Sequence, residues 1–323
     1  MTPKLISTII PGEMSKVDDM IVHYLYSPIK IIQEVGAHII KSGGKRLRPA
    51  IVVLSALASN YNSGTNHLKL ATVVEFIHTA TLLHDDVVDE SRLRRGSATA
   101  NVIFGNAATV LVGDFLYSRA FQLVAEIEND QVTYELAQAT NTIAEGEISQ
   151  LINLQDPEIS EDTYYAIVRS KTARLFETAA KLGAILGGLE NHACEAFASY
   201  GSHMGVAFQL IDDALDYSGD KDTIGKNLGD DFSQGKVTLP LIYVMKNGSD
   251  KQRKFLRDAI KSQSDSNLER VVEVMELNNA IEYVHGKAKI EIQLAIDALQ
   301  AISDSKYKKC LIDLAKFSIE RRA

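Results

Sequence analysis

The sequences Asp-Asp-Val-Val-Asp at residues 85–89 and Asp-Asp-Ala-Leu-Asp at residues 212–216 decide how this chain is organised. Each closes an apolar stretch with helical periodicity, and helix positions i and i+4 share a face. The first and last Asp of each stretch therefore point the same way. Such carboxylates repel one another unless a cation lies between them, and Mg²⁺ completes oxygen-ligand sites with water and substrate phosphate. The two stretches predict a site that grips a phosphorylated substrate from two sides.

Helical periodicity continues through most of the chain. Apolar residues recur at i, i+3, i+4 and i+7 over residues 70–89, 107–128, 134–154, 163–187, 193–216, 283–302 and 306–321. The chain has only 6 prolines, and no long tract alternates with period two, so we expect little sheet. The two acidic stretches lie far apart in the sequence, and a shared site would join both halves in one body. We therefore expect a single all-α domain over residues 1–323, a large helical bundle around a deep central cavity.

Composition excludes several classes of protein. The chain of 323 residues is 46% hydrophobic and has a formal net charge of -8 without a long basic run, which argues against nucleic-acid binding. Cys194 and Cys310 are in no metal or redox spacing, so we interpret them as buried free thiols in a reducing cytosol. We find no signal peptide and no apolar run long enough to cross a bilayer. The expectation is a cytoplasmic protein without a membrane span.

A basic turn at residues 43–49, Gly-Gly-Lys-Arg-Leu-Arg-Pro, precedes one of the apolar tracts. The glycines end the preceding helix, and Pro49 suits the first turn of the next one. Lys45 and Arg48 then lie near a helix N-terminus, where backbone N–H groups also attract anions. By itself such a turn is more often solvated surface, so it indicates an anion site only in combination with the other motifs.

Further polar residues accompany the acidic stretches. His78 and Thr81 lie on the Asp85 side of the first helix, and Gln209 precedes the second cluster by one turn. The Arg94-Arg95-Gly96 motif either compensates the nearby carboxylates or holds phosphate. A lone histidine on a helix is more often structural, but the shared face with Asp85 favours function for His78.

Two further lysine motifs complete the set. Lys171-Thr172 interrupts an apolar helical run, where a buried cation requires an anionic partner. The glycine-punctuated segment 218–237 carries Lys226 and Lys236 and is either a lid that closes over a bound diphosphate or an exposed connector.

The combination of motifs resembles the trans-isoprenyl diphosphate synthase family. The resemblance covers residues 35–240 and is closest to the bacterial octaprenyl-forming branch through residues 76–89 and 144–147. The motifs that carry it follow the family's order: Gly43–Pro49, Leu83–Asp89, Arg94–Gly96, Lys171–Thr172, Phe208–Asp213 and Gly235–Lys236. It implies the isoprenoid synthase type of helical bundle and a long-chain all-trans prenyltransferase. Such an enzyme adds isopentenyl diphosphate to an allylic diphosphate such as farnesyl diphosphate and supplies a quinone side chain.

The resemblance also implies roles for single residues. Two or three Mg²⁺ ions would bind with the diphosphate. The metal residues would be Asp85, Asp89 and Asp212, with Asp86, Asp213 and Asp216 as further ligands or water-linked partners. The allylic diphosphate would meet Arg94, Lys171, Thr172, Gln209, Lys226 and Lys236. Isopentenyl diphosphate would meet Lys45, Arg48, His78 and Arg95. Catalysis would rest on Asp85, Asp89, Arg94, Lys171, Asp212 and Lys236.

Product length depends on the residues just before the first acidic stretch. In the family these positions line the tunnel for the growing chain, and here they are Ala80 and Thr81. Two small side chains predict an open tunnel and a long product, with octaprenyl expected and shorter or longer chains as alternatives. As the floor we take Phe121, Leu123 and Leu136.

Three other interpretations compete. A class I terpene cyclase shares the fold but lacks the basic site and usually carries a different second metal motif. A non-catalytic prenyl synthase subunit tends to lose its Asp motifs, and both are present here. A structural metal-binding protein leaves the ordered basic residues unexplained. The resemblance further implies a homodimer through residues 107–150, and a transient membrane contact for product release stays open.

Overall fold

The computed structural model describes residues 2–41, 44–94, 96–218 and 228–320, and helices make up most of this part of the chain. The helices of the first half are α1 (Thr2–Ile9), α2 (Pro11–Leu25), α3 (Lys30–Lys41), α4 (Leu47–Ala58), α5 (Asn66–Val88), α6 (Ala100–Phe104), α7 (Asn106–Ala125) and α8 (Asp130–Ile152). Those of the second half are α9 (Glu161–Val168), the π-helix η1 (Arg169–Ala173), α10 (Arg174–Leu186), α11 (Asn191–Ser218), α13 (Asp230–Ser233), α14 (Leu239–Asn247), α15 (Asp250–Ser262), the 3₁₀ turn η2 (Asp265–Asn267), α16 (Leu268–Leu277), α17 (Ala280–Ala298) and α18 (Lys306–Ile319).

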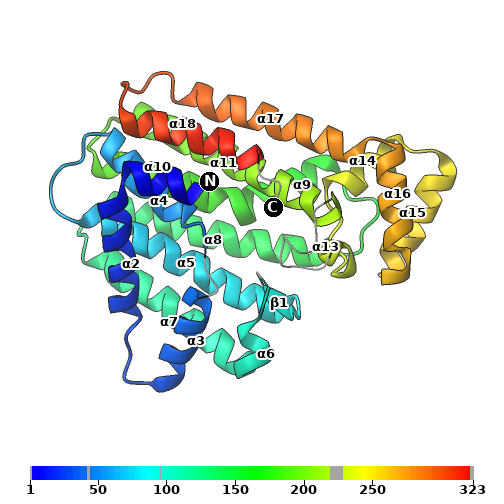
Figure 1. Ribbon diagram of the computed structural model, residues 1–323, viewed down its shortest axis with the longest axis horizontal. Coiled ribbons are helices and arrows are strands. Elements are labelled where there is room, and N and C mark those ends of the chain that lie inside the picture. Colours follow the sequence, from blue (N-terminus) through cyan, green and yellow to red (C-terminus); the bar gives the residue numbers. More distant parts are fainter. Residues whose placement is uncertain (1, 42–43, 95, 219–227, 321–323) are drawn as a thin grey trace.

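The helices form a bundle with its longest members inside. Helix α5 packs against α4 and α7, while α10 packs against both α4 and α11. Helix α11 in turn packs along α17. In Figure 1, α17 and α18 run along one side, α6 and α7 lie on the opposite side, and α15 and α16 extend at one end. The bundle thereby brings α5 and α11, which carry the two acidic stretches, into one body.

The expected helices are confirmed, with one informative difference. The tract 163–187 is not a uniform α-helix, because residues 169–173 form a π-helical turn between α9 and α10. Ser160 caps α9 as its sequence indicates, with its hydroxyl accepting from the Thr163 amide at 3.0 Å. Strand content is low within the described residues: β1 (Leu93–Arg94) pairs antiparallel with β2 (Ser97–Ala98).

Glycines set the distance between the central helices. A Cβ at Gly183 of α10 would lie 2.6 Å from the Val52 carbonyl oxygen and from the Ala56 amide nitrogen of α4. A Cβ at Gly205 of α11 would lie 2.6 Å from the Cα of Ala173. Both distances are shorter than a real Cβ atom keeps from a backbone atom. The helices therefore approach each other so closely that only glycine fits at these two positions. These two contacts hold α4 against α10 and α11 against η1.

Two expectations from composition can be compared with the structure. Cys194 and Cys310 are both buried free thiols, as predicted. Among the helices of the described ranges, none is both long enough and apolar enough to cross a membrane.

Candidate active site

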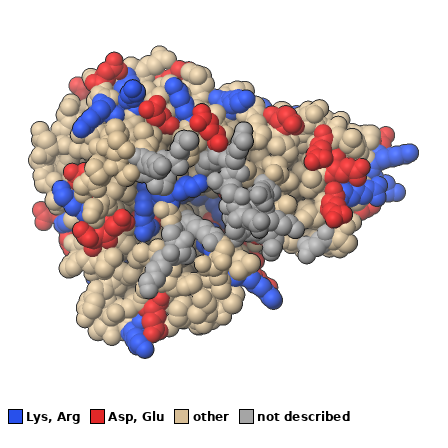
Figure 2. Space-filling model, in the orientation of Figure 1, with Lys and Arg blue, Asp and Glu red and all other residues tan. Residues whose placement is uncertain are grey.

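A cavity of about 890 Å³ opens between α5, α8, η1 and α11. Figure 2 shows basic side chains within a hollow near the middle of one face. The sequence-predicted residues that line the cavity are Lys45, Arg48, His78, Thr81, Asp85, Asp89, Arg94, Lys171, Thr172, Gln209, Asp212, Asp213, Asp216 and Lys236. Its apolar lining includes Leu82, Leu154, Ile167, Phe208 and Leu215. One cavity thus combines charged walls with an apolar part, as an amphiphilic ligand requires.

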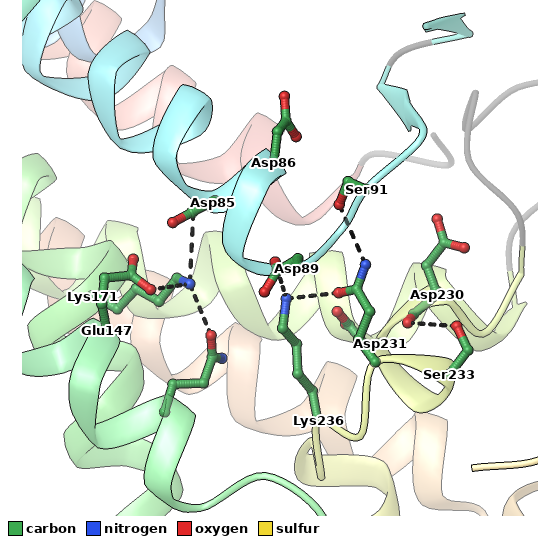
Figure 3. A network of polar contacts seen from close by, with 12 residues as sticks. Asp85, Asp86, Asp89, Ser91, Glu147, Lys171, Asp230, Asp231, Ser233 and Lys236 are labelled. Atoms are coloured by element: carbon green, nitrogen blue, oxygen red, sulfur yellow. Dashed lines mark hydrogen bonds and ion pairs between the residues drawn. The ribbon is translucent and has the colours of Figure 1, made fainter. Parts of the chain in front are cut away.

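The first acidic stretch ends α5 at the cavity wall. Asp85 lies on the last turn of the helix, and Asp89 caps its C-terminus. Each carboxylate faces a lysine from a distant segment: Lys171 Nζ lies 3.7 Å from Asp85, and Lys236 Nζ lies 2.6 Å from Asp89 (Figure 3). Opposite charges at these distances offset the repulsion between the two carboxylates.

Asp86 does not share this orientation. It is buried, it is absent from the cavity lining, and Figure 3 shows it pointing away from Asp85 and Asp89. Arg94 donates to it from Nε at 2.9 Å and from a terminal nitrogen at 2.7 Å. Burial raises the pKa of Asp86, and Arg94 acts in the opposite direction. Neighbouring helix positions point about 100° apart, so Asp86 points away from the face that Asp85 and Asp89 share. Its carboxylate is paired with Arg94, and its expected role as a metal residue stays a prediction.

Lys171 is held from two sides. Its Nζ donates to Glu147 at 2.5 Å and to Gln150 at 2.8 Å, both on α8. Burial, reinforced by the charge of Asp85, raises the pKa of Glu147 to about 7. The π-helical turn η1 carries Lys171 and Thr172, and both line the cavity. Single π turns often occur at functional sites.

The second acidic stretch divides its carboxylates between two roles. Asp212 is exposed on the cavity wall, whereas Asp213 is 1% exposed. Asp213 accepts hydrogen bonds from the Tyr164 hydroxyl at 2.5 Å and from the Gln209 amide at 2.7 Å. Burial raises the pKa of Asp213 well above its usual range, and the charge of Asp231 adds to the effect. Asp213 therefore anchors the wall to which Asp212 belongs.

Asp216 and Lys236 tie the short helix α13 to both acidic stretches. Asp216 accepts from the Asp231 amide at 3.1 Å, one turn beyond Asp212 on α11. Lys236 binds Asp89 on α5 and also donates to Gln234 at 2.8 Å. Burial lowers the pKa of Lys236, but the charges of Asp231 and Asp89 outweigh it, so that the pKa is raised and the side chain stays protonated. This segment therefore links the two acidic walls and lines the cavity between them.

The basic turn lines the cavity as well, and the histidine that it meets, His78, lies about 10 Å before Asp85 along α5. Lys45 lines it from the turn, and Arg48 lines it from the first turn of α4. Arg48 lies 3.3 Å from His78 Nε2, and its guanidinium carbon lies 4.2 Å from the centre of the Phe176 ring. A guanidinium over an aromatic ring is held by a cation–π interaction. The turn therefore offers donors to an anion at a place distinct from the lysines at the acidic walls.

Some expectations fall elsewhere. Gly43, Arg95 and residues 219–227 of the lid segment, with Lys226 among them, lie outside the described residues. Ala80 is completely buried and does not line the cavity, whereas Thr81 does. Of the expected tunnel floor, Leu123 and Leu136 are fully buried and Phe121 is 38% exposed.

Sequence reasoning missed several lining residues as functional: Arg46, Glu75, Glu147, Gln150, Tyr164, Asp230, Asp231 and Gln234. Glu75 had a usable signal, because it precedes His78 by three residues on the same face of an apolar helix. A carboxylate at such a position requires a partner. The others lie on separate helices and loops, and their convergence depends on packing.

The carboxylates are suited to a hard cation. Asp85, Asp89 and Asp212 offer oxygen donors from two sides of the cavity, the ligand chemistry of Mg²⁺. Within the described ranges, however, no three His, Cys, Asp or Glu side chains converge as a metal site. Mg²⁺ commonly binds through one or two carboxylates, water and substrate phosphate. The donor set therefore fits an ion that arrives with a phosphorylated ligand.

Comparisons with known proteins agree on one family. The family model described as polyprenyl synthetase matches residues 29–278. The chain is 47% identical to an octaprenyl diphosphate synthase of Haemophilus influenzae, covering 96% of this chain and 94% of the relative. Identity to the Escherichia coli octaprenyl diphosphate synthase is 45%, with 99% of both chains covered. A crystal structure of a Caulobacter crescentus polyprenyl synthase, complexed with calcium and isoprenyl diphosphate, superposes with a TM-score of 0.96 at 40% identity, covering 99% of this chain and 98% of that chain.

Adjacent aspartates should differ in their effect on stability. We expect Asp213→Ala to lower the free energy of unfolding by about 2 kcal/mol, because the Tyr164 hydroxyl and the Gln209 amide would lose their buried partner. Asp212→Ala is the matched control, expected within about 0.5 kcal/mol of the parent since its side chain is exposed. Denaturant unfolding followed by circular dichroism measures both. Equal stability of the two variants would contradict a structural role for Asp213.

Proposed function

The chain belongs to the polyprenyl synthetase family and is a prenyltransferase, and on that premise we propose that it makes octaprenyl diphosphate. The observation that carries the product assignment is the 45–47% identity to octaprenyl diphosphate synthases over nearly the whole chain. A shorter or longer all-trans product is the alternative. We further propose that the enzyme works in the cytoplasm as one all-α domain and supplies a quinone side chain. Within the described residues, one buried apolar cluster runs from Ile6 to Ala315, which supports the one-domain proposal.

The allylic diphosphate would bind between the two acidic walls. Asp85, Asp89 and Asp212 would hold Mg²⁺ there, and bound Mg²⁺ supplies positive charge to the departing diphosphate. Lys171 and Lys236 already face this space, each paired with a carboxylate. A diphosphate and its metal ions would replace those pairings, so that the lysines donate to phosphate oxygens and the carboxylates bind metal. Further contacts to the allylic diphosphate would come from Arg94, Thr172, Gln209 and Lys226.

Isopentenyl diphosphate would bind at the basic turn. Lys45 and Arg48 suit a diphosphate because one is a mobile point charge and the other a planar fork. His78 is within hydrogen-bonding reach of Arg48 and would complete the site, with Arg95 as a further residue. The separation between this turn and the acidic walls would keep the two diphosphates apart while their carbon chains meet.

The chemistry follows from this separation. The cations around the allylic diphosphate stabilise the charge that develops as it leaves. The double bond of isopentenyl diphosphate attacks the resulting allylic cation, and the new cation then loses a proton, which the departed diphosphate can accept. The apolar lining, with Leu82, Phe208 and Leu215 among its members, excludes water that would otherwise quench the cation.

The proposal is tested with purified protein, Mg²⁺, labelled isopentenyl diphosphate and farnesyl diphosphate. We expect octaprenyl diphosphate as the main product by chromatography and loss of turnover with a chelator. Asp212→Asn should lower kcat by at least about 100-fold while the protein stays folded, since the lost charge acts on the transition state. Asp250→Asn, an exposed aspartate at the start of α15, serves as the control. Turnover that persists in the chelator would contradict the mechanism.

Product length should respond to Thr81. We propose that Ala80 and Thr81 leave space for the growing chain, and Thr81 is the one of the two that lines the cavity. Thr81→Phe should shorten the main product by several isoprene units because the ring fills the path beside α5. Thr81→Val keeps the size of the side chain and should leave the product length unchanged. Identical product profiles for the parent and Thr81→Phe would refute the assignment.

We also propose a homodimer through α7 and α8. Large apolar side chains are exposed on both helices, including Leu111 at 67%, Tyr134 at 61% and Ile148 at 61%. Exposed apolar patches mark interaction sites, and these side chains are the candidates for one. Leu111→Glu with Ile148→Glu should shift the protein from dimer to monomer in light scattering coupled to gel filtration. Leu277→Glu changes an equally exposed leucine on α16 and should leave the mass unchanged. A monomeric parent would rule the dimer out.

A further inference from the structure

A buried carboxylate lines the cavity together with the cations of the basic turn. Glu75 on α5 is 6% exposed, and it lines the cavity together with Lys45, Arg46 and Arg48. An acid at this place opposes the binding of a diphosphate unless its charge is compensated. Its presence beside the basic turn therefore requires a physical reason.

The partner of Glu75 is Arg46. A terminal guanidinium nitrogen of Arg46 donates to the Glu75 carboxylate, and Arg46 Nε lies 3.4 Å from Asp18 on α2. The side chains of Glu75 and Arg46 are largely buried, with 8% and 18% of their surface exposed, whereas 58% of the Asp18 side chain is exposed. The carboxylate of Glu75 is thus the desolvated partner, and a buried pair of this kind loses much more than an exposed one when a member is removed.

Arg46 also has an unusual backbone. Its φ of 47° and ψ of 35° lie in the left-handed region, which disfavours residues with a Cβ, and it stands at the N-cap of α4 without a side-chain cap. Such a conformation persists only where surrounding contacts over-determine it. The ion pair to Glu75 is such a contact. The left-handed residue sets the direction of the chain between Lys45 on one side and Arg48 on the other.

Glu75 and His78 act on the same turn from one helix. They are three residues apart on α5, so they lie on the same side of it. Glu75 binds Arg46, and His78 lies 3.3 Å from Arg48. One face of α5 therefore contacts both arginines of the turn, Arg46 and Arg48.

We propose that Glu75 is a positioning residue for the isopentenyl diphosphate site. Through Arg46 it holds residue 46 in the left-handed conformation and so aims Lys45 and Arg48 at the cavity. Arg46 in return cancels the charge of Glu75, which removes its repulsion of the diphosphate. The inference rests on the proposed function and assigns Glu75 no contact with substrate.

The first experiment compares Glu75→Gln with the parent protein. Binding of inorganic diphosphate is measured by calorimetry in the presence of a chelator, so that the metal-dependent acidic site does not contribute. We expect the dissociation constant, and the KM for isopentenyl diphosphate, to rise about tenfold, as for loss of an outer partner that orients a ligand-binding group. The KM for the allylic diphosphate and kcat should change less than about twofold, because the acidic walls are untouched. Asp18→Asn removes the exposed partner of Arg46 and should leave binding within about twofold.

The second experiment uses glycine at position 46. Glycine takes the left-handed conformation without strain, so the positioning by Glu75 is no longer needed, and its unpaired charge becomes harmful. The double variant with Arg46→Gly and Glu75→Gln should therefore bind diphosphate more tightly than Arg46→Gly alone. If the two substitutions instead weaken binding multiplicatively, or if Glu75→Gln leaves both the dissociation constant and the KM unchanged, the inference is overturned.

The two proposals can fail separately. A parent protein without turnover of isopentenyl diphosphate would overturn the proposed function. The dissociation constants for diphosphate of the parent, Glu75→Gln, Arg46→Gly and the double variant would still decide the role of Glu75. Thermal unfolding of each variant shows whether it is folded. If Glu75→Gln does not fold, the comparison of Arg46→Gly with the double variant decides the matter.

Discussion

The structure depends on the compensation of charge within its central cavity. Carboxylates from α5, α8 and α11 face a space that is only partly open to water, where an uncompensated charge is costly. Lys171 and Lys236 provide the opposite charge, and each comes from a segment remote in sequence from the Asp it meets. The pairs draw η1 and the segment after α13 onto the end of α5. They also leave cations and carboxylates next to each other, ready to exchange partners when a polyanion and metal ions enter.

Close helix packing makes this arrangement possible. Gly183 lets α10 lie against the backbone of α4, and Gly205 lets α11 lie against the π-helical turn. These contacts place the second acidic stretch and Lys171 at fixed positions relative to α5. Hydrogen bonds then refine the walls: Tyr164 and Gln209 hold Asp213, and Asp213 in turn fixes the helix turn that presents Asp212. A rigid wall of this kind orients charge before a ligand arrives, which is how electrostatic catalysis avoids reorganisation.

Sequence patterns predicted the helices well because a period of 3.6 is a local property. The helical tract at 70–89 corresponds to α5, and the cap at Ser160 lies where its sequence indicates. The cavity likewise contains Asp85, Asp89 and Asp212 as expected, since residues four apart on a helix share a face whatever surrounds them. Neighbouring residues are a different case. Asp86 binds Arg94 and Asp213 is enclosed, and a pattern of types alone does not separate them from Asp85 and Asp212.

The amino-acid sequence by itself determined the all-α class, the two acidic helix ends, the basic turn and, through their order, the family. These features are carried by local periodicity and by residue types whose chemistry has few uses. The tertiary structure alone decided which carboxylate faces the cavity and which cation it meets. It revealed that Glu75 holds Arg46, that Glu147 holds Lys171, and that Ala80 lies in the packed interior while Thr81 lines the cavity. The physical reason is that burial and pairing depend on the distance between helices, which is set by the packing of segments far apart in the chain.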